Sequence, residues 1–177
     1  QEIQQVAEAG VSVIHCPESN MKLASGFCPT HELLKNNVRV IIGTDSSASN
    51  DDLDMFSEIR SAALIAKGVS GEATAFPAQQ AIRAATIDAA KALGLDDEIG
   101  SLEQGKSADI IAISCDSIEG HPIYDVHSHL VYSTNQSRVS DVFVSGRQLL
   151  RERTLTTISE DEILAKTEQW TQKISQP

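Results

Sequence analysis

Two short apolar segments, each followed by a polar residue, constrain the fold of this chain most strongly. Val11–His15 and Val38–Gly43 are nearly continuous apolar runs, and residues 30–36 between them have a helical pattern. Near-continuous apolar runs are typical of parallel strands that are buried on both faces. The order strand, helix, strand indicates βα units, so the sequence predicts an α/β fold with a parallel sheet or barrel.

Two further helices are expected after the second strand. Apolar residues at helical spacing predict a helix that begins with a capping box at Ser49 and Asp52 and ends at Gly68. Another helix is expected to open at Pro77 and to end at Gly94. Residues 1–94 are therefore assigned to the βα units.

The remainder of the chain has a different pattern. Turn residues and short β-type runs predict a small antiparallel sheet within residues 95–155. Residues 100–114 contain turn residues and then a short β run, and further strands are expected at 129–134 and 139–150 with a hairpin turn at Ser145–Arg147. Residues 156–177 are expected to form a helix, with a capping box at Ser159 and an apolar stripe through Trp170 that packs against the protein.

The start of the chain indicates that it belongs to something larger. Residues 1–10 already read as a helix that stops at Gly10, with no methionine at position 1 and no signal-peptide pattern. We therefore expect this chain to be the C-terminal part of a longer protein.

Charge and cysteine content exclude several classes of partner. The chain has 14 Lys and Arg against 25 Asp and Glu, a formal charge of −11, which argues against binding to nucleic acid or to an anionic membrane surface. No apolar run approaches the ~20 residues that a membrane-spanning helix needs. Three cysteines without a CxxC pair fit a reducing compartment such as the cytoplasm better than a disulfide framework.

The polar residues at the strand ends are the candidates for chemistry. His15 and Asp45 are each read as the last residue of a buried strand, and loop residues follow both. In a βα barrel the C-terminal ends of the strands face the active site, so the two side chains are expected to share one site. The alternative is that Asp45 caps the next helix or turn and that His15 is a hydrogen-bonded core histidine.

Three longer motifs resemble a known superfamily. HCPESNMKLASG (residues 15–26), GTDSSASNDDLDMFSEIRSAALIAKG (43–68) and IGSLEQGKSADIIAI (99–113) are similar to segments of the amidohydrolase superfamily, in the branch of 5-methylthioadenosine/S-adenosylhomocysteine deaminases and triazine hydrolases. The resemblance implies the C-terminal part of a (β/α)8 barrel of the TIM type, plus part of a small composite β-sandwich. Asp51 departs from the pattern, in which a second asparagine follows Asn50.

The resemblance also implies a reaction. Asp45 would be a metal ligand and accept a proton from the metal-bound water, and His15 would hydrogen-bond the attacking oxygen. One divalent metal is expected, with zinc preferred over iron or manganese, and Asn20, Ser49 and Asn50 are candidate substrate contacts. The implied reaction is hydrolytic deamination of the adenine ring of a small purine nucleoside, by a parent protein expected to be a homo-oligomer.

Two alternative functions remain open. The same site could hydrolyse a guanine, pterin or triazine ring, or the chain could be a non-catalytic barrel remnant that binds or assembles. The remaining metal ligands and the acid–base glutamate of the superfamily would precede Gln1, so this chain alone is expected to be inactive. His127 and His129 form an H-x-H pair for which a surface or hydrogen-bonded role is expected and metal binding is the less favoured alternative. Cys16 and Cys28 are read as buried thiols, with a substrate contact by one of them left open.

Overall fold

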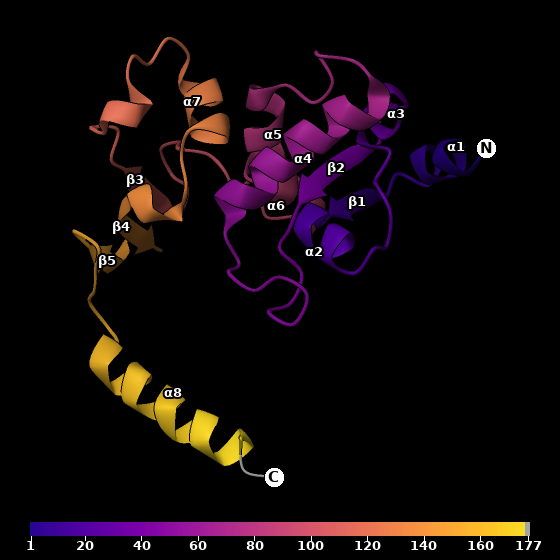
Figure 1. The fold of residues 1–177 in the computed structure, drawn as a ribbon. Helices are drawn as coiled ribbons and strands as arrows, with labels where there is room; N and C mark the ends of the chain where they lie inside the picture. Colours follow the sequence, from indigo (N-terminus) through magenta and orange to yellow (C-terminus); the bar gives the residue numbers. More distant parts are fainter. Residues whose placement is uncertain (176–177) are drawn as a thin grey trace. The chain divides into compact units, whose positions relative to one another are not determined.

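The two apolar segments form the parallel strands β1 (Ser12–His15) and β2 (Arg39–Ile42). Ser12 pairs with Arg39 and His15 with Ile42, so both strands end at the same edge of the sheet. The computed structural model describes residues 1–175, and Figure 1 shows these strands among the helices of the first half of the chain. The prediction of βα units with parallel strands is confirmed.

The chain divides into two compact units. Unit 1 comprises residues 1–106 and 115–138, and unit 2 comprises residues 107–114 and the chain from residue 139 onward. The helices of unit 1 are α1 (Glu2–Glu8), α2 (Pro17–Lys22), α3 (Thr30–Lys35), α4 (Met55–Ser70), α5 (Ala78–Ala84), α6 (Ile87–Leu93), α7 (Val126–Tyr132) and the 3-10 turns Ile118–Gly120 and Gln136–Arg138.

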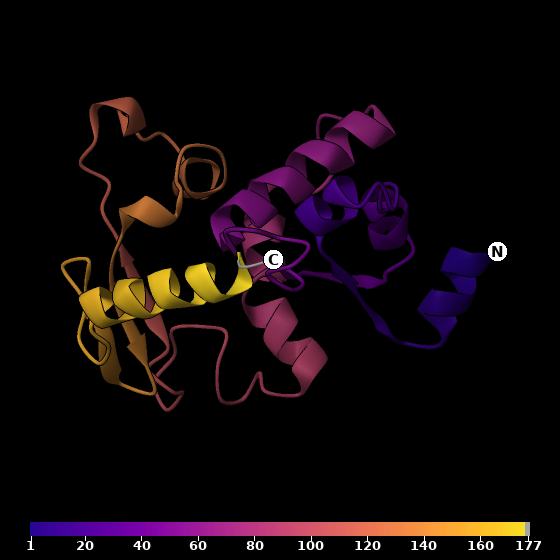
Figure 2. The ribbon, with the colours of Figure 1, turned by 60° about the horizontal axis from the view of Figure 1, so that its bottom comes forward.

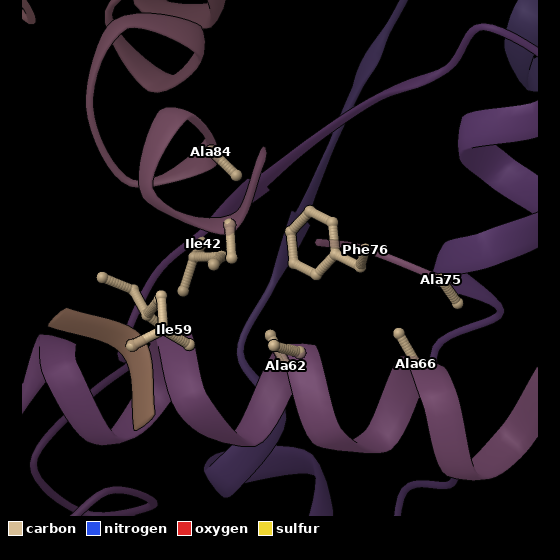
Figure 3. Close-up of a cluster of buried hydrophobic side chains, with 10 residues drawn as sticks. Ile42, Ile59, Ala62, Ala66, Ala75, Phe76 and Ala84 are labelled. Carbon is tan, nitrogen blue, oxygen red and sulfur yellow. The ribbon is translucent and has the colours of Figure 1, made fainter. Parts of the chain in front are cut away.

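The main core of unit 1 lies between β2 and the helices α4, α5 and α7. Figure 3 shows the Phe76 ring facing Ala62 and Ala66 of α4, with Ile42 of β2 beside it. Small alanine side chains at one face of α4 let the neighbouring elements approach the helix closely. The core therefore fixes α4 against β2 and holds the carboxyl end of that strand in place.

A second apolar cluster explains the first helix. Val38 and Val40 are buried with Leu33 of α3, and Ile3 and Val6 of α1 pack against them. The apolar face predicted for the first ten residues is therefore confirmed, and Gly10 follows the helix at φ +65°.

β1 differs from the expectation of burial on both faces. Three of the four residues of β2 are buried, whereas Ile14 of β1 is 63% exposed. The reason is topological: within the described residues β2 is the only strand that pairs with β1, so its other edge carries no partner strand.

The ends of the predicted helices also differ. α4 begins at Met55 and its N-cap is Asp54, whose carboxylate accepts a hydrogen bond from the Phe56 backbone at 2.9 Å, so the capping box predicted at Ser49 was wrong. Gly68 lies inside the helix, which ends at Gly71 in the left-handed conformation. The helix predicted from Pro77 to Gly94 is divided, because Thr86 leaves helical geometry between α5 and α6.

Residues 129–134, predicted as a strand, lie mostly in the helix α7. Asp125 caps this helix by accepting a hydrogen bond from the Ser128 backbone at 2.7 Å, and Val131 is completely buried in the main core. A local cap and one buried contact therefore outweigh the β propensity of the sequence HLVY.

Unit 2 contains an antiparallel sheet in the order β3-β4-β5-β6. Its strands are β3 (Ile110–Ile113), β4 (Val139–Val144), β5 (Arg147–Arg151) and β6 (Thr154–Leu155). β4 and β5 are joined by the predicted tight turn, with Ser145 and Gly146 at positive φ.

The last helix, α8 (Glu160–Ile174), is the yellow helix of Figure 2. Ser159 caps it by accepting a hydrogen bond from the Glu162 backbone at 3.3 Å, as predicted. Its apolar stripe does not pack: Trp170 is 62% exposed and Ile174 is 79% exposed. Among residues 1–175, no helix is both long and apolar enough to cross a membrane.

The exposed edge of β1 generates a prediction. Expressed by itself, the 177-residue chain is expected to self-associate through this edge, because an unpaired strand with an exposed isoleucine favours edge-to-edge pairing. Ile14→Thr keeps a β-branched residue but removes apolar surface, and it should raise the monomer fraction in size-exclusion chromatography with light scattering. Ile118→Thr, at a 91% exposed residue outside any strand, is the control; an equal gain in that variant would contradict the edge as the cause.

Candidate functional site

The imidazole of His15 lies at the carboxyl end of β1 with its hydrogen-bonding capacity unused. His15 is only 2% exposed, and neither Nδ1 nor Nε2 has a hydrogen-bond partner among the described residues. Burial lowers the pKa of His15 to about 4, so the ring is neutral at pH 7. The ring therefore does not match the alternative of a hydrogen-bonded core histidine, because a buried polar group without a partner is costly.

Asp45 follows the neighbouring strand at the same edge of the sheet. The Gly43 backbone donates to the His15 carbonyl at 3.1 Å, which continues the pairing of β1 with β2 to within two residues of Asp45. Asp45 is solvent-exposed and adopts a positive φ of +65°, a conformation that is uncommon outside glycine. Because Asp54 caps α4, Asp45 does not have the helix-capping role of the alternative interpretation. Its carboxylate does bond the turn that follows it, through the Ser46 backbone and the Ser49 hydroxyl.

Two serine hydroxyls hold the Asp45 carboxylate. Ser19 of α2 and Ser49 of the loop before α4 both donate to Oδ2, at 2.7 and 2.8 Å. These hydrogen bonds lower the pKa of Asp45, so the carboxylate is ionised at neutral pH. Both serines are buried, which makes this orientation of the carboxylate well defined.

The sequence interpretation did not select Ser19. The signal for it is Pro17, which occupies the first turn of α2 and thereby starts a helix directly after β1. A helix that starts there returns Ser19 to the strand end, where its hydroxyl reaches Asp45.

The three candidate substrate contacts have different surroundings. Ser49 lies against Asp45, as described above. Asn50 is 3% exposed, and its side chain donates to Glu58 and accepts from the Leu53 backbone at 2.8 Å. Asn20 lies half-buried in α2. The structure therefore brings Ser49 to the carboxylate and Asn50 to a second acidic residue, Glu58.

Glu58 is the second functional candidate that the sequence interpretation missed. Its side chain is fully buried on α4, and its oxygens accept hydrogen bonds from the Glu18 backbone at 3.3 Å and from Asn50. Burial raises the pKa of Glu58 to about 7. The available signal was its helical spacing from Ala62 and its neighbour Ile59, which places an acidic residue on the buried face of α4.

The other sequence candidates lie in different settings. His127 and His129 are on the helix α7, where residues two apart project in different directions and do not chelate one ion. Burial and the charge of Asp45 raise the pKa of the half-buried Cys16, so its thiol is protonated. Asp51, the departure from the superfamily pattern, forms an exposed ion pair with Lys22 at 2.7 Å.

The donor set fits one part of a metal centre. Asp45 offers an ionised carboxylate and His15 a neutral, unbonded imidazole, both of which suit a divalent ion site. Within residues 1–175, no group of three His, Cys, Asp or Glu side chains could hold a metal. Because a catalytic zinc normally has three protein ligands, these residues would need ligands from additional chain.

Comparison with known proteins identifies the family of this chain. The amidohydrolase family profile matches residues 1–149. A 5-methylthioadenosine/S-adenosylhomocysteine deaminase from Teredinibacter turnerae is 50% identical over 98% of this chain, and this match covers 39% of that relative. The chain therefore spans about two fifths of the length of this relative.

Solved structures agree with the sequence matches. A zinc-bound adenosine deaminase from Xanthomonas campestris superposes with a TM-score of 0.94 and 47% identity, over 98% of this chain and 39% of that structure. A zinc complex of atrazine chlorohydrolase from Arthrobacter aurescens superposes with a TM-score of 0.85 and 30% identity, over 95% of this chain and 37% of that structure. On the extent of the profile match, this chain belongs to the amidohydrolase family.

Proposed function

We propose that this chain is the C-terminal part of a metal-dependent deaminase that acts on the adenine ring of 5-methylthioadenosine or S-adenosylhomocysteine. The observation that carries the proposal is that a neutral, unbonded His15 ends one of two parallel strands while an ionised Asp45 follows the other at the same edge of the sheet. The 50% identity to a deaminase of that name supports the choice of substrate. Unit 1 would contribute the last βα units of the barrel, and unit 2 part of the composite β-sandwich.

The chain's own residues have two roles in this proposal. Asp45 would be one ligand of a divalent ion, with zinc favoured because the solved relatives carry it. Such an ion, when bound, lowers the pKa of water to about 7. The Asp45 carboxylate would accept the proton of that water, and the His15 ring would hydrogen-bond the oxygen that adds to the ring carbon as ammonia leaves.

The remaining features of the whole protein are also proposals. The other metal ligands and the acid–base residue would lie in additional chain, so residues 1–177 alone would not turn over substrate. The full protein would be a cytoplasmic homo-oligomer that binds a purine nucleoside and neither nucleic acid nor membrane.

A triazine or related ring is the second candidate substrate. The observation in its favour is the TM-score of 0.85 with atrazine chlorohydrolase. The lower identity, 30% against 47% for the adenosine deaminase, makes it the weaker choice. Turnover of 5-methylthioadenosine, adenosine, guanine and atrazine by the complete protein would decide between these substrates.

Asp45→Asn in the complete deaminase is expected to reduce turnover by about 10²–10⁴-fold, because the variant loses the proton acceptor. Bound zinc per subunit should also fall. Asp51→Asn makes the same chemical change at an exposed residue of the same loop and should keep normal turnover. Deamination rate and metal content measure both effects, and near-normal turnover in Asp45→Asn would refute this mechanism.

His15→Asn is expected to lower turnover while zinc content stays near that of the parent, because His15 is assigned to the reacting oxygen and not to the metal. His31→Asn is the matched control, since His31 also has a buried ring nitrogen, Nε2, without a partner among the described residues. Loss of zinc in His15→Asn would reassign that residue as a ligand, contrary to the proposed role.

A further inference from the structure

The buried carboxylate of Glu58 joins two segments that are distant in sequence. Its Oε2 accepts a hydrogen bond from the backbone of Glu18, in the first turn of α2, at 3.3 Å. Its Oε1 accepts a hydrogen bond from the side-chain amide of Asn50, in the loop before α4. Glu58 is 0% exposed and Asn50 is 3% exposed, so the bond between them is buried, and the bond from the Glu18 backbone is partly buried.

Each of these two segments also supplies a hydrogen-bond donor to Asp45. Glu18 immediately precedes Ser19, and Asn50 immediately follows Ser49. The hydroxyls of the two serines donate to the same carboxylate oxygen, Oδ2 of Asp45. One side chain on α4 therefore bonds the residue next to each serine, through the backbone of Glu18 and through the side chain of Asn50.

We propose that Glu58 is a positioning residue for the Asp45 carboxylate, acting through Glu18 and Ser19 on one side and through Asn50 and Ser49 on the other. This inference rests on the proposed catalytic role of Asp45. Glu58 does not itself touch the reacting atoms in this role. It sets the relative position of α2 and the loop, and thereby the direction in which the carboxylate points.

A purely structural role is a poor explanation for an acidic residue at this position. Burying a carboxylate costs free energy that an apolar side chain of similar size avoids. The negative charges of Glu18 and Asp52, which face Glu58 from α2 and from the loop, add to that cost. What a carboxylate offers here is two acceptor oxygens on one rigid group, one for each segment.

Two further sets of contacts join the segments that Glu58 connects, one between α2 and α4 and one at the surface between α2 and the loop before α4. The side chain of Glu18 accepts hydrogen bonds from Ser57 and Ser61 of α4, so the first turn of α2 is held to α4 in both directions. Lys22 of α2 also bonds Asp51 of the loop, but this pair is exposed, and exposed ion pairs contribute little. The Lys22–Asp51 pair is therefore a natural control, because it joins the same two segments without burial.

The hydrogen bonds of Glu58 to Glu18 and Asn50 form a clamp. A double substitution can exchange donor and acceptor in the bond between positions 50 and 58, while the bond from the Glu18 backbone keeps its direction. In Glu58→Gln one oxygen still accepts from the Glu18 backbone, but the new amide then faces the amide of Asn50, donor against donor. In Asn50→Asp two carboxylates face each other. In Asn50→Asp/Glu58→Gln the new amide at position 58 donates to the new carboxylate at position 50. The other oxygen of that carboxylate still accepts from the Leu53 backbone, so all three hydrogen bonds are restored.

The test compares the two single variants, the double variant and Lys22→Gln in the complete deaminase. We expect each single variant to lower kcat by about 10²-fold with a smaller change in KM, because displacing a catalytic group by about 1 Å has effects of that size. The double variant should recover most of kcat, and Lys22→Gln should stay within about twofold of the parent. Bound zinc per subunit and the midpoint of thermal unfolding are measured for every variant.

Normal kcat in Glu58→Gln would overturn the inference. So would a double variant whose fold loss in kcat equals the product of the two single losses. Recovery of the unfolding midpoint without recovery of kcat would show a clamp that serves stability alone, which also overturns it. Failure of the proposed function is distinguishable, because the unsubstituted protein would then show no deaminase turnover. In that case bound zinc per subunit is compared across the same variants. It should fall in both single variants and return in the double variant.

Discussion

The parallel pairing of β1 with β2 is the constraint on which the rest of this structure depends. A register that places His15 opposite Ile42 ends both strands at one edge, and the chain then turns directly into α2 on one side and into the Asp45 loop on the other. Parallel strands expose their carboxyl ends together, so polar residues that follow them collect at one place. The core between β2 and α4 keeps that edge fixed.

The strands and the polar residues at their ends could be predicted from sequence, because apolar runs and their interruptions are local patterns. The helix ends were less predictable. Ser49 had the form of a cap, yet it lies against Asp45, and Asp54 caps α4 instead. Several residues in one loop can each cap a helix, and only tertiary contacts decide which one does. The strand predicted at residues 129–134 failed for the same reason, since its outcome depends on the burial of Val131.

The hydrogen-bond partners of Ser19 and Glu58 could not be predicted from the sequence, although local patterns place the two residues at the start of α2 and on the buried face of α4. Ser19 and Glu58 come from different helices, and their roles follow from contacts across 26 and 40 residues of chain. A local pattern identifies the residue that carries charge, such as Asp45, but not the neutral hydroxyls that orient it. Because Ser19 and Ser49 are buried, they hold the Asp45 carboxylate in one orientation. Both the proposed metal-binding role of Asp45 and its positioning by Glu58 require that orientation.

Anomalous scattering at the zinc absorption edge, from crystals of the complete protein, is the most direct measurement of whether this edge of the sheet is a metal site. We expect one zinc peak per subunit, with the Asp45 carboxylate as a direct ligand and the His15 ring facing the same site without coordinating the ion. A zinc peak that does not involve Asp45 would contradict the account.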